Sequence, residues 1–134
     1  MKPFDHSKLR KSVNKSLGIS SGFHDPKMWV DTGNYALNMM ISNDFKKGVP
    51  LGKVTVFAGE SGSGKSFIAS GNLIRSCQQQ GVYVVLMDSE YALDETWLSN
   101  LGVDTSDDKI TRYSVSLVDD CAKIVSNFME IYLA

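Results

Sequence analysis

Residues 59–66 read GESGSGKS, and this octet holds residue types that can wrap a polyphosphate. It matches the pattern G-x-x-x-x-G-K-[ST]. Gly59, Gly62 and Gly64 permit backbone angles that a Cβ disfavours, so consecutive N–H groups can converge on one anion. Lys65 supplies a mobile positive charge for the outer phosphates, and the hydroxyl of Ser66 can bind Mg²⁺. The octet therefore predicts a loop that binds a nucleoside triphosphate.

The segments on either side of the octet predict the elements that would position it. Residues 53–58, KVTVFA, are short, apolar and β-branched, which favours a strand. Residues 67–80 predict a helix, whose positive end would face the phosphates. The apolar residues that recur at helical spacing are Phe67, Ala69, Leu73, Ile74 and Cys77. The alternative, a flexible glycine- and serine-rich turn, does not explain why Lys65 and Ser66 open a helix.

A second cluster of polar residues follows the apolar run GVYVVLMD, residues 81–88, which predicts a buried strand of a parallel sheet. At the end of this strand, Glu90 can orient and deprotonate a water molecule, and Asp88 can hold Mg²⁺ through the ion's hydration shell. The alternative is a solvated loop in which Asp94 caps the next helix. Trp97 could fill the core or offer a surface on which a base stacks.

The remaining segments predict a basic N-terminal helix and a set of alternating elements. The helix spans residues 1–18, with Asp5 or Ser7 as its N-cap and Gly18 as its stop, and a linker follows over 19–28. This helix is either a solvated face or an arm that docks on a neighbouring molecule. Residues 35–45 predict a helix with Leu37, Met40 and Ile41 inward, ended by the turn region 48–50.

Three further elements follow the second strand. Residues 95–101 predict a short helix stopped at Gly102, and residues 109–115 predict a strand. A last helix is expected from Ser116, which would cap it, to the end. Its apolar stripe is Val118, Cys121, Val125, Phe128 and Tyr132.

Composition limits the classes of protein that fit. The 134 residues make one domain at most, and 43% of them are hydrophobic, which is enough for a core. The net charge of −1 gives no global sign of binding to nucleic acid or to an anionic membrane. The N-terminus is too polar for a signal peptide, so Cys77 and Cys121 are expected to be reduced core thiols in a cytoplasmic protein. No apolar run approaches the ~20 residues that span a bilayer.

Two motifs in the same order and spacing resemble the ATPase core of RecA-type recombinases. They are the octet, the Walker A motif of that family, and DSEYALD followed by LGVD after the second strand. The segment ISNDFKKGVPLGK and the basic N-terminal helix resemble the phage branch, the UvsX recombinases. The resemblance covers most of residues 30–110. It implies an α/β P-loop NTPase fold, a RecA-like three-layer core with a parallel sheet, preceded by a short N-terminal helix.

The resemblance also implies roles for single residues. The triphosphate would be bound by Gly59, Glu60, Ser61, Gly62, Ser63, Gly64, Lys65 and Ser66. Glu90 and Lys65 would be catalytic, and Ser66 would bind Mg²⁺. The Mg²⁺ role of Asp88 depends instead on its position at the end of the second strand, because the resemblance assigns an aspartate of a later strand to the metal. Asp94 would lie against adenine, and Trp97 would take the place of a tyrosine that stacks on it. VVLMDSE has a rival interpretation as the Walker B strand, which leaves the role of Glu90 unchanged.

Cores of this type contain a third and a fourth strand that lie between the first two, and the present sequence does not reach them. We therefore expect a fragment, with residues 1–30 as helix and linker and 31–134 as an incomplete ATPase core. Strands 53–58 and 82–88 would pair directly through a right-handed crossover, or another copy would fill the gap between them. Direct pairing is the preferred alternative.

The function implied by the resemblance is ATP-dependent recombination in the cytoplasm of a bacterium or a phage-infected host. The whole protein would form filaments on single-stranded DNA and exchange strands. DNA would bind beyond residue 134, and the N-terminal helix would dock on the neighbouring protomer. Alternatives are the motor of a hexameric helicase, a P-loop nucleotide kinase, and a non-enzymatic assembly module. Activity of residues 1–134 alone is not expected.

Overall fold

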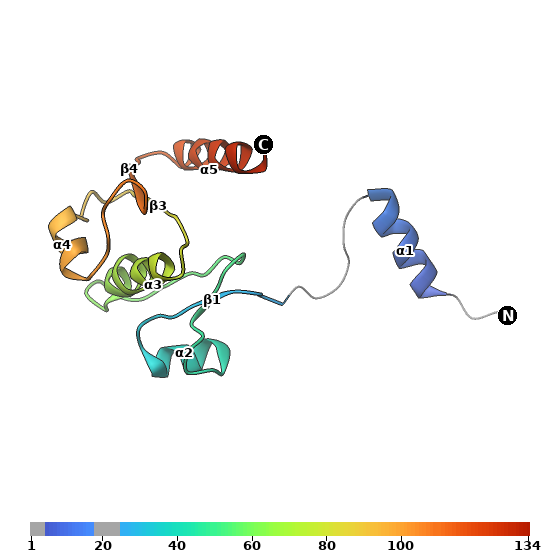
Figure 1. The fold of residues 1–134 in the computed structure, drawn as a ribbon, viewed down its shortest axis with the longest axis horizontal. Coiled ribbons are helices and arrows are strands. Elements are labelled where there is room, and N and C mark those ends of the chain that lie inside the picture. Colours follow the sequence, from blue (N-terminus) through green and yellow to red (C-terminus); the bar gives the residue numbers. More distant parts are fainter. Residues whose placement is uncertain (1–4, 18–24) are drawn as a thin grey trace.

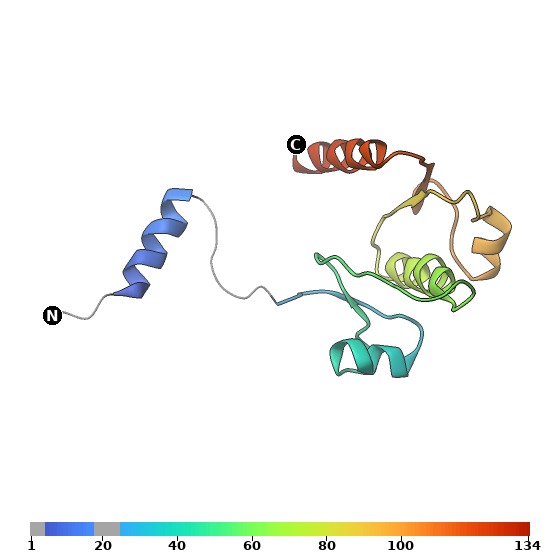
Figure 2. The same cartoon turned by 180° about the vertical axis from the view of Figure 1, so that it is seen from behind.

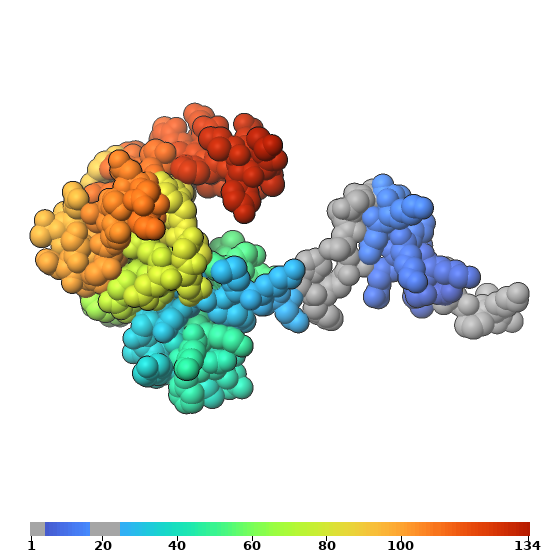
Figure 3. Space-filling view, in the orientation of Figure 1, coloured from blue at the N-terminus to red at the C-terminus, as the bar shows by residue number. Residues whose placement is uncertain are grey.

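A computed structural model describes residues 5–17 and 25–134 as a mixed α/β arrangement of helices and short strands (Figures 1 and 2). The elements in chain order are α1 (His6–Leu17), β1 (Trp29–Val30), α2 (Tyr35–Ser42), β2 (Val49–Pro50), the π-helix η1 (Phe67–Leu73), α3 (Ile74–Gln79), β3 (Val84–Asp88), α4 (Glu95–Asn100), β4 (Ile110–Ser114) and α5 (Val118–Leu133). The space-filling view shows one mass from residue 25 onward, with α1 apart from it (Figure 3).

Helix α1 confirms the predicted N-terminal helix and its aspartate cap. The Oδ1 atom of Asp5 accepts the N–H groups of Ser7 and Lys8, at 3.0 and 3.2 Å. These bonds satisfy backbone donors that a helix start leaves unpaired. The apolar residues Leu9 and Val13 stay 51% and 40% exposed, so α1 packs little surface against the rest of the described chain. The predicted stop at Gly18 and most of the predicted linker lie outside the described residues.

Helix α2 packs through one buried asparagine of its own, Asn38, and not through the predicted apolar face. Strands β1 and β2 pair antiparallel on one side of this helix, with Val30 opposite Val49. Asn38 is fully buried: its Oδ1 accepts from the N–H and hydroxyl of Thr32, at 3.0 and 2.7 Å, and its Nδ2 donates to Asp31 and to the carbonyl of Phe45. The predicted inward positions of Met40 and Ile41 are wrong, because these residues are 84% and 38% exposed.

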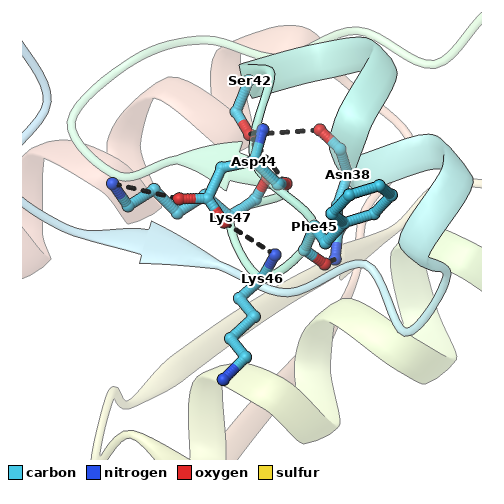
Figure 4. A network of polar contacts seen from close by, with 6 residues as sticks. All are labelled: Asn38, Ser42, Asp44, Phe45, Lys46 and Lys47. Carbon is cyan, nitrogen blue, oxygen red and sulfur yellow. Dashed lines mark hydrogen bonds and ion pairs between the residues drawn. The ribbon is translucent and has the colours of Figure 1, made fainter.

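Further polar contacts hold the loop between α2 and β2 (Figure 4). The hydroxyl of Ser42 donates to the carbonyl of Asn38 at 3.1 Å, and Asp44 accepts the N–H of Lys46 and pairs with Lys47. The helix ends earlier than predicted, because Asn43 adopts a left-handed conformation with φ 59°. The predicted turn region at 48–50 contributes strand β2 instead.

The predicted strand at 53–58 is wrong in this structure. These residues have no regular secondary structure, and Val54 and Val56 are 93% and 79% exposed. The preferred direct pairing with the second strand is also wrong, because β3 pairs with β4. A strand is stable only with a partner that satisfies its N–H and C=O groups, and none of the described residues supplies one here. The described sheets are therefore two pairs of strands, not the larger sheet of a three-layer core.

Strands β3 and β4 form a parallel pair that carries the main apolar cluster. Val84 lies opposite Ile110, and the register continues to Asp88 opposite Ser114. The cluster joins α3, α4 and the two strands through Ile74, Leu98, Val103 and Ile110, with Val84, Leu86 and Trp97 packed against it. β3 itself is only half-buried over Val84–Met87, against the prediction of a buried strand.

Specific contacts fix α3 against the segment that follows α4. Gln78 exchanges two hydrogen bonds with the backbone of Asp104, at 2.7 and 2.9 Å. A Cβ at Gly71, in the adjoining η1, would lie 2.6 Å from the Cδ1 of Leu101, so glycine allows this leucine side chain to lie close to the helix without shifting. These contacts set the position of the helix that follows the octet.

Helix α5 confirms the predicted last helix but not its cap. Its N-cap is Leu117, without a side-chain hydrogen bond, because the hydroxyl of Ser116 instead contacts that of Tyr91 at 2.7 Å. The ring of Phe128 meets Tyr113 edge to face, with centroids 6.3 Å apart. The rest of the predicted stripe does not form a buried face: Val118 is 84% and Tyr132 90% exposed. Among the described helices, none has the length and hydropathy required to cross a bilayer.

Candidate functional site

The octet folds as a turn that leads directly into a helix. The N–H of Ser63 donates to the carbonyl of Glu60 at 3.2 Å, and the helix begins at Lys65. Gly62 and Gly64 have φ of 78° and 91°, a region that side chains with a Cβ rarely adopt. The carbonyl of Gly64 then accepts the N–H of Ile68 at 3.0 Å. Gly59 does not have a positive φ, so the local geometry agrees with the predicted role of the glycines at two of the three positions.

Lys65 extends across the turn that it follows. Its Nζ donates to the carbonyls of Gly59 and Glu60, at 2.9 and 2.8 Å. A lysine ammonium has three protons, so two are used within the loop and the third can serve an anion. The side chain is half-buried, which limits how much water screens its charge.

A pocket of about 430 Å³ joins this loop to the end of β3. Its lining combines residues from both sequence motifs, namely Ser61, Gly62, Gly64, Lys65, Ser66, Phe67 and Glu90. Glu90 is 24 positions beyond Ser66, so only the fold brings it to the loop. Glu90, which the sequence assigned to water activation, therefore lines the same pocket as five of the eight residues predicted to bind the phosphates. The other three, Gly59, Glu60 and Ser63, are not part of this lining.

Asp88 lies at the last position of β3, beside this pocket, and is only 5% exposed. Its Oδ1 accepts the N–H of Glu90 at 3.1 Å, and its Oδ2 accepts the N–H of Leu93 at 3.2 Å and the Nη2 of Arg112 at 2.9 Å. Burial alone would raise the pKa of Asp88, but the two backbone N–H groups and the Arg112 guanidinium outweigh it and hold that pKa below its ordinary value.

Asp88 and Ser66 also share a smaller hollow of about 170 Å³, which Ser70, Glu90 and Leu93 help to line. The two residues predicted to serve a metal ion thus face one space. No cluster of three or more His, Cys, Asp or Glu side chains suited to a metal occurs among the described residues. A hydroxyl and one carboxylate fit Mg²⁺, which keeps several waters and takes few protein ligands.

Asp94 and Trp97 are not brought to the pocket that the loop shares with Glu90. Asp94 caps α4, accepting the N–H of Trp97 on its Oδ1 at 2.7 Å. Trp97 is half-buried and packs against the apolar cluster. Asp94 therefore makes the helix-capping contact that was the alternative role predicted from the sequence. Adenine binding by Asp94 and Trp97 stays a prediction.

Sequence reasoning missed two side chains at this site, Arg112 and Tyr91. Arg112 comes from the middle of β4 and pairs with Asp88. Strands of a parallel sheet are usually apolar, so an arginine inside the predicted strand 109–115 was the feature of the sequence that could have indicated this ion pair. Tyr91 has a φ of 56°, which no motif in the sequence indicated. Phe67, predicted as part of the inward helix face, is 48% exposed and lines the pocket.

Comparisons with known proteins agree with the two motifs. The family model described as the RecA N-terminal domain matches residues 10–120. Protein RecA of Sulfurovum sp. (strain NBC37-1) is 34% identical over 101 residues, which are 71% of this chain and 28% of that protein. Protein RecA of Heliobacterium modesticaldum is 34% identical over 100 residues, 69% of this chain and 28% of that protein. The chain thus spans less than a third of the length of these relatives. Because the family model matches most of its residues, the chain belongs to the RecA family.

Proposed function

We propose that the chain binds ATP with Mg²⁺ at residues 59–66 and that Glu90 activates the water that attacks the terminal phosphate. The observation that carries this proposal is the common pocket of Glu90, Lys65 and Ser66. A general base must stand within reach of the water it deprotonates, and a phosphate loop fixes where that water is needed. The N–H groups of Gly62 and Gly64, an ammonium group and a helix N-terminus are donors of the kind that a polyphosphate requires.

The residues around the pocket divide this work. The third proton of Lys65 would bind an outer phosphate, and the hydroxyl of Ser66 would bind Mg²⁺. An ionised carboxylate has about four acceptor positions. Protein donors already occupy three of these positions on Asp88. One position on Oδ1 therefore remains for a water molecule of the metal ion. When bound, Mg²⁺ neutralises charge on the phosphates.

The adenine contacts belong to the same proposal. Asp94 is exposed and uses its Oδ1 for the cap, so its Oδ2 could accept from a base. Trp97 keeps part of its ring outside the apolar cluster, and that part could stack on adenine.

At the level of the whole protein, we propose an ATP-dependent recombinase that assembles on single-stranded DNA and exchanges strands in the bacterial or phage-infected cytoplasm. Its place in the UvsX branch is part of this proposal, supported by the segment 41–53 and the basic N-terminal helix. Residues 31–134 would form part of a P-loop NTPase core, and DNA would be bound beyond residue 134. Residues 1–30 would serve self-association: Leu9 and Val13 of α1 are exposed and could pack on a neighbouring protomer.

Two glycine variants test the nucleotide site with a matched backbone cost. Gly64 and Gly52 have positive φ, 91° and 75°, and a Cβ at either would meet nothing within 4 Å. Alanine at each position therefore carries a similar strain of about 1–2 kcal/mol, but only Gly64 lines the pocket. Titration with a fluorescent, slowly hydrolysed ATP analogue and Mg²⁺ should show saturable binding by the wild-type chain and by Gly52→Ala, and binding weakened about tenfold or more in Gly64→Ala. Absence of wild-type binding, or equal losses in both variants, would refute the proposal.

A further inference from the structure

The loop between β3 and α4 is held at several points around Glu90. Asp88 takes the N–H groups of Glu90 and Leu93 on its two oxygens, so it brackets this loop from inside. The carbonyl of Asp88 accepts the N–H of Val115 at 3.1 Å, which ties the end of β3 to the residue after β4. The loop that carries the proposed base is therefore fixed to the sheet and not only to its chain neighbours.

Arg112 completes this arrangement from the neighbouring strand. Its Nη2 lies 2.9 Å from the Oδ2 of Asp88, whose side chain is 4% exposed, while its own side chain is 34% exposed. A buried carboxylate needs a partner for its charge, and removing that partner leaves the charge uncompensated. Arg112 therefore compensates part of the charge of Asp88 at the position where this carboxylate accepts both backbone N–H groups.

Tyr91 shows that the loop is constrained. A φ of 56° is unfavourable for a bulky side chain and persists only where the surroundings enforce it. Asp88 binds the chain on both sides of Tyr91, through Glu90 and Leu93, and the Tyr91 hydroxyl contacts Ser116 at 2.7 Å. These contacts hold the residue next to Glu90 in a conformation that the isolated segment would leave.

We infer that Asp88 and Arg112 are positioning residues: together they hold the strained loop that presents Glu90 to the nucleotide pocket. The inference rests on the proposed function for the role of Glu90, but the geometry of the bracket does not depend on it. Neither residue needs to contact the nucleotide. Arg112 reaches Asp88 from β4 because this strand pairs in parallel with β3. The register of the two strands therefore contributes to the position of Glu90.

The test uses four variants of the chain. Asp88→Asn replaces one acceptor with an NH₂ group that would face the donors of Leu93 or Arg112. Arg112→Gln removes the cation, and Arg112→Lys keeps the charge but not the planar guanidinium. Lys123→Gln is the control, because it removes one positive charge from an exposed pair, Lys123 with Asp120 at 3.5 Å.

Amide hydrogen exchange, read residue by residue by NMR, measures the bracket directly. Exchange at Glu90 and Leu93 should rise about tenfold or more in Asp88→Asn and Arg112→Gln, less in Arg112→Lys, and not in Lys123→Gln. The amide of Leu98, in the core of α4, reports global unfolding and should keep its rate. Unchanged exchange at Glu90 and Leu93, or an equal rise at Leu98, would overturn the inference.

ATP turnover, measured in a full-length version of the protein, provides the functional readout. In Arg112→Gln, kcat should fall about tenfold with KM within twofold, because the phosphate loop is untouched while the base is misplaced. Arg112→Lys should recover part of that loss, and a kcat equal to that of Lys123→Gln would contradict the positioning role. If the full-length protein neither binds nor hydrolyses ATP, the proposed function fails, and the exchange rates alone then decide whether Asp88 and Arg112 hold the loop.

Discussion

Replacing Lys65 with alanine removes the only side-chain cation that lines the pocket shared by the loop and Glu90, among the described residues. In the free chain this ammonium gives two protons to the carbonyls of Gly59 and Glu60. A phosphate can take the third proton without breaking either bond. The variant therefore loses a contact to the nucleotide and also the two bonds that shape the turn before the nucleotide arrives.

The size of the effect follows from this geometry. A hydrogen bond to a charged partner contributes about 1.5–3 kcal/mol, which corresponds to about 10- to 150-fold in affinity. Lys65 is half-buried, so water screens part of its charge, and we expect a value near the lower limit, about tenfold. The free energy of unfolding should change little, because no apolar contact of the core is lost.

Equilibrium titration with a fluorescent ATP analogue in Mg²⁺ measures this loss as a ratio of dissociation constants. Lys53→Ala is the matched control, since Lys53 is exposed and lies outside the pocket. Thermal unfolding followed by circular dichroism verifies that both variants are folded. A dissociation constant for Lys65→Ala within twofold of that for Lys53→Ala would show that the ammonium does not contact phosphate, and the assignment of the loop would fail.

Three other predictions concern the base, the buried amide and the acid limit of the loop. In a full-length version of the protein, Glu90→Gln should bind the ATP analogue as the wild type does and lose about 100-fold or more in turnover, because an amide holds water but is a poor base. Glu130→Gln, on the exposed face of α5, is the control, and turnover retained in Glu90→Gln would exclude the role of Glu90 as the base. Asn38→Ala should lower the free energy of unfolding by about 2–4 kcal/mol in urea titrations, because two buried and two partly buried hydrogen bonds lose their partner. Asn100→Ala, at an exposed site, should change it by less than about 1 kcal/mol. The pKa of Asp88 is lowered in the folded chain, so the stabilising contacts of its carboxylate are complete above the ordinary aspartate pKa of about 3.9 and are lost as the pH falls through the lowered pKa. The NMR chemical shift of the Glu90 amide should therefore change only below about pH 4. A change of this shift near pH 6 would contradict the assignment to Asp88.

Local features of the chain were predictable from the sequence because neighbouring residues satisfy them. The glycines at 62 and 64 adopt the positive φ that the octet implied, and the helix opens at Lys65. Asp5 and Asp94 cap the helices that follow them, since a capping side chain reaches N–H groups only two or three residues ahead. The parallel strands β3 and β4 also follow the predicted segments, with shorter bounds.

Strand formation at 53–58 could not be decided in the same way. The residues have the right composition, but a strand satisfies its backbone groups through partners distant in sequence, and no described segment pairs with this one. Val54 and Val56 accordingly stay exposed. The prediction that Met40 faces inward failed for a related reason. The buried hydrogen bonds of Asn38 decide which side of α2 packs, and a prediction from the spacing of apolar residues does not include a polar residue.

The sequence by itself determined a glycine-rich turn, the helix after it and an acidic segment after a strand, because each depends on residue types within one short stretch. The tertiary structure alone decided that Glu90 lines the pocket of that loop, that Arg112 neutralises Asp88, and that Ser116 serves Tyr91 instead of capping α5. These contacts join residues about 24 or more positions apart. Their geometry depends on strand register and helix packing, which no single segment encodes.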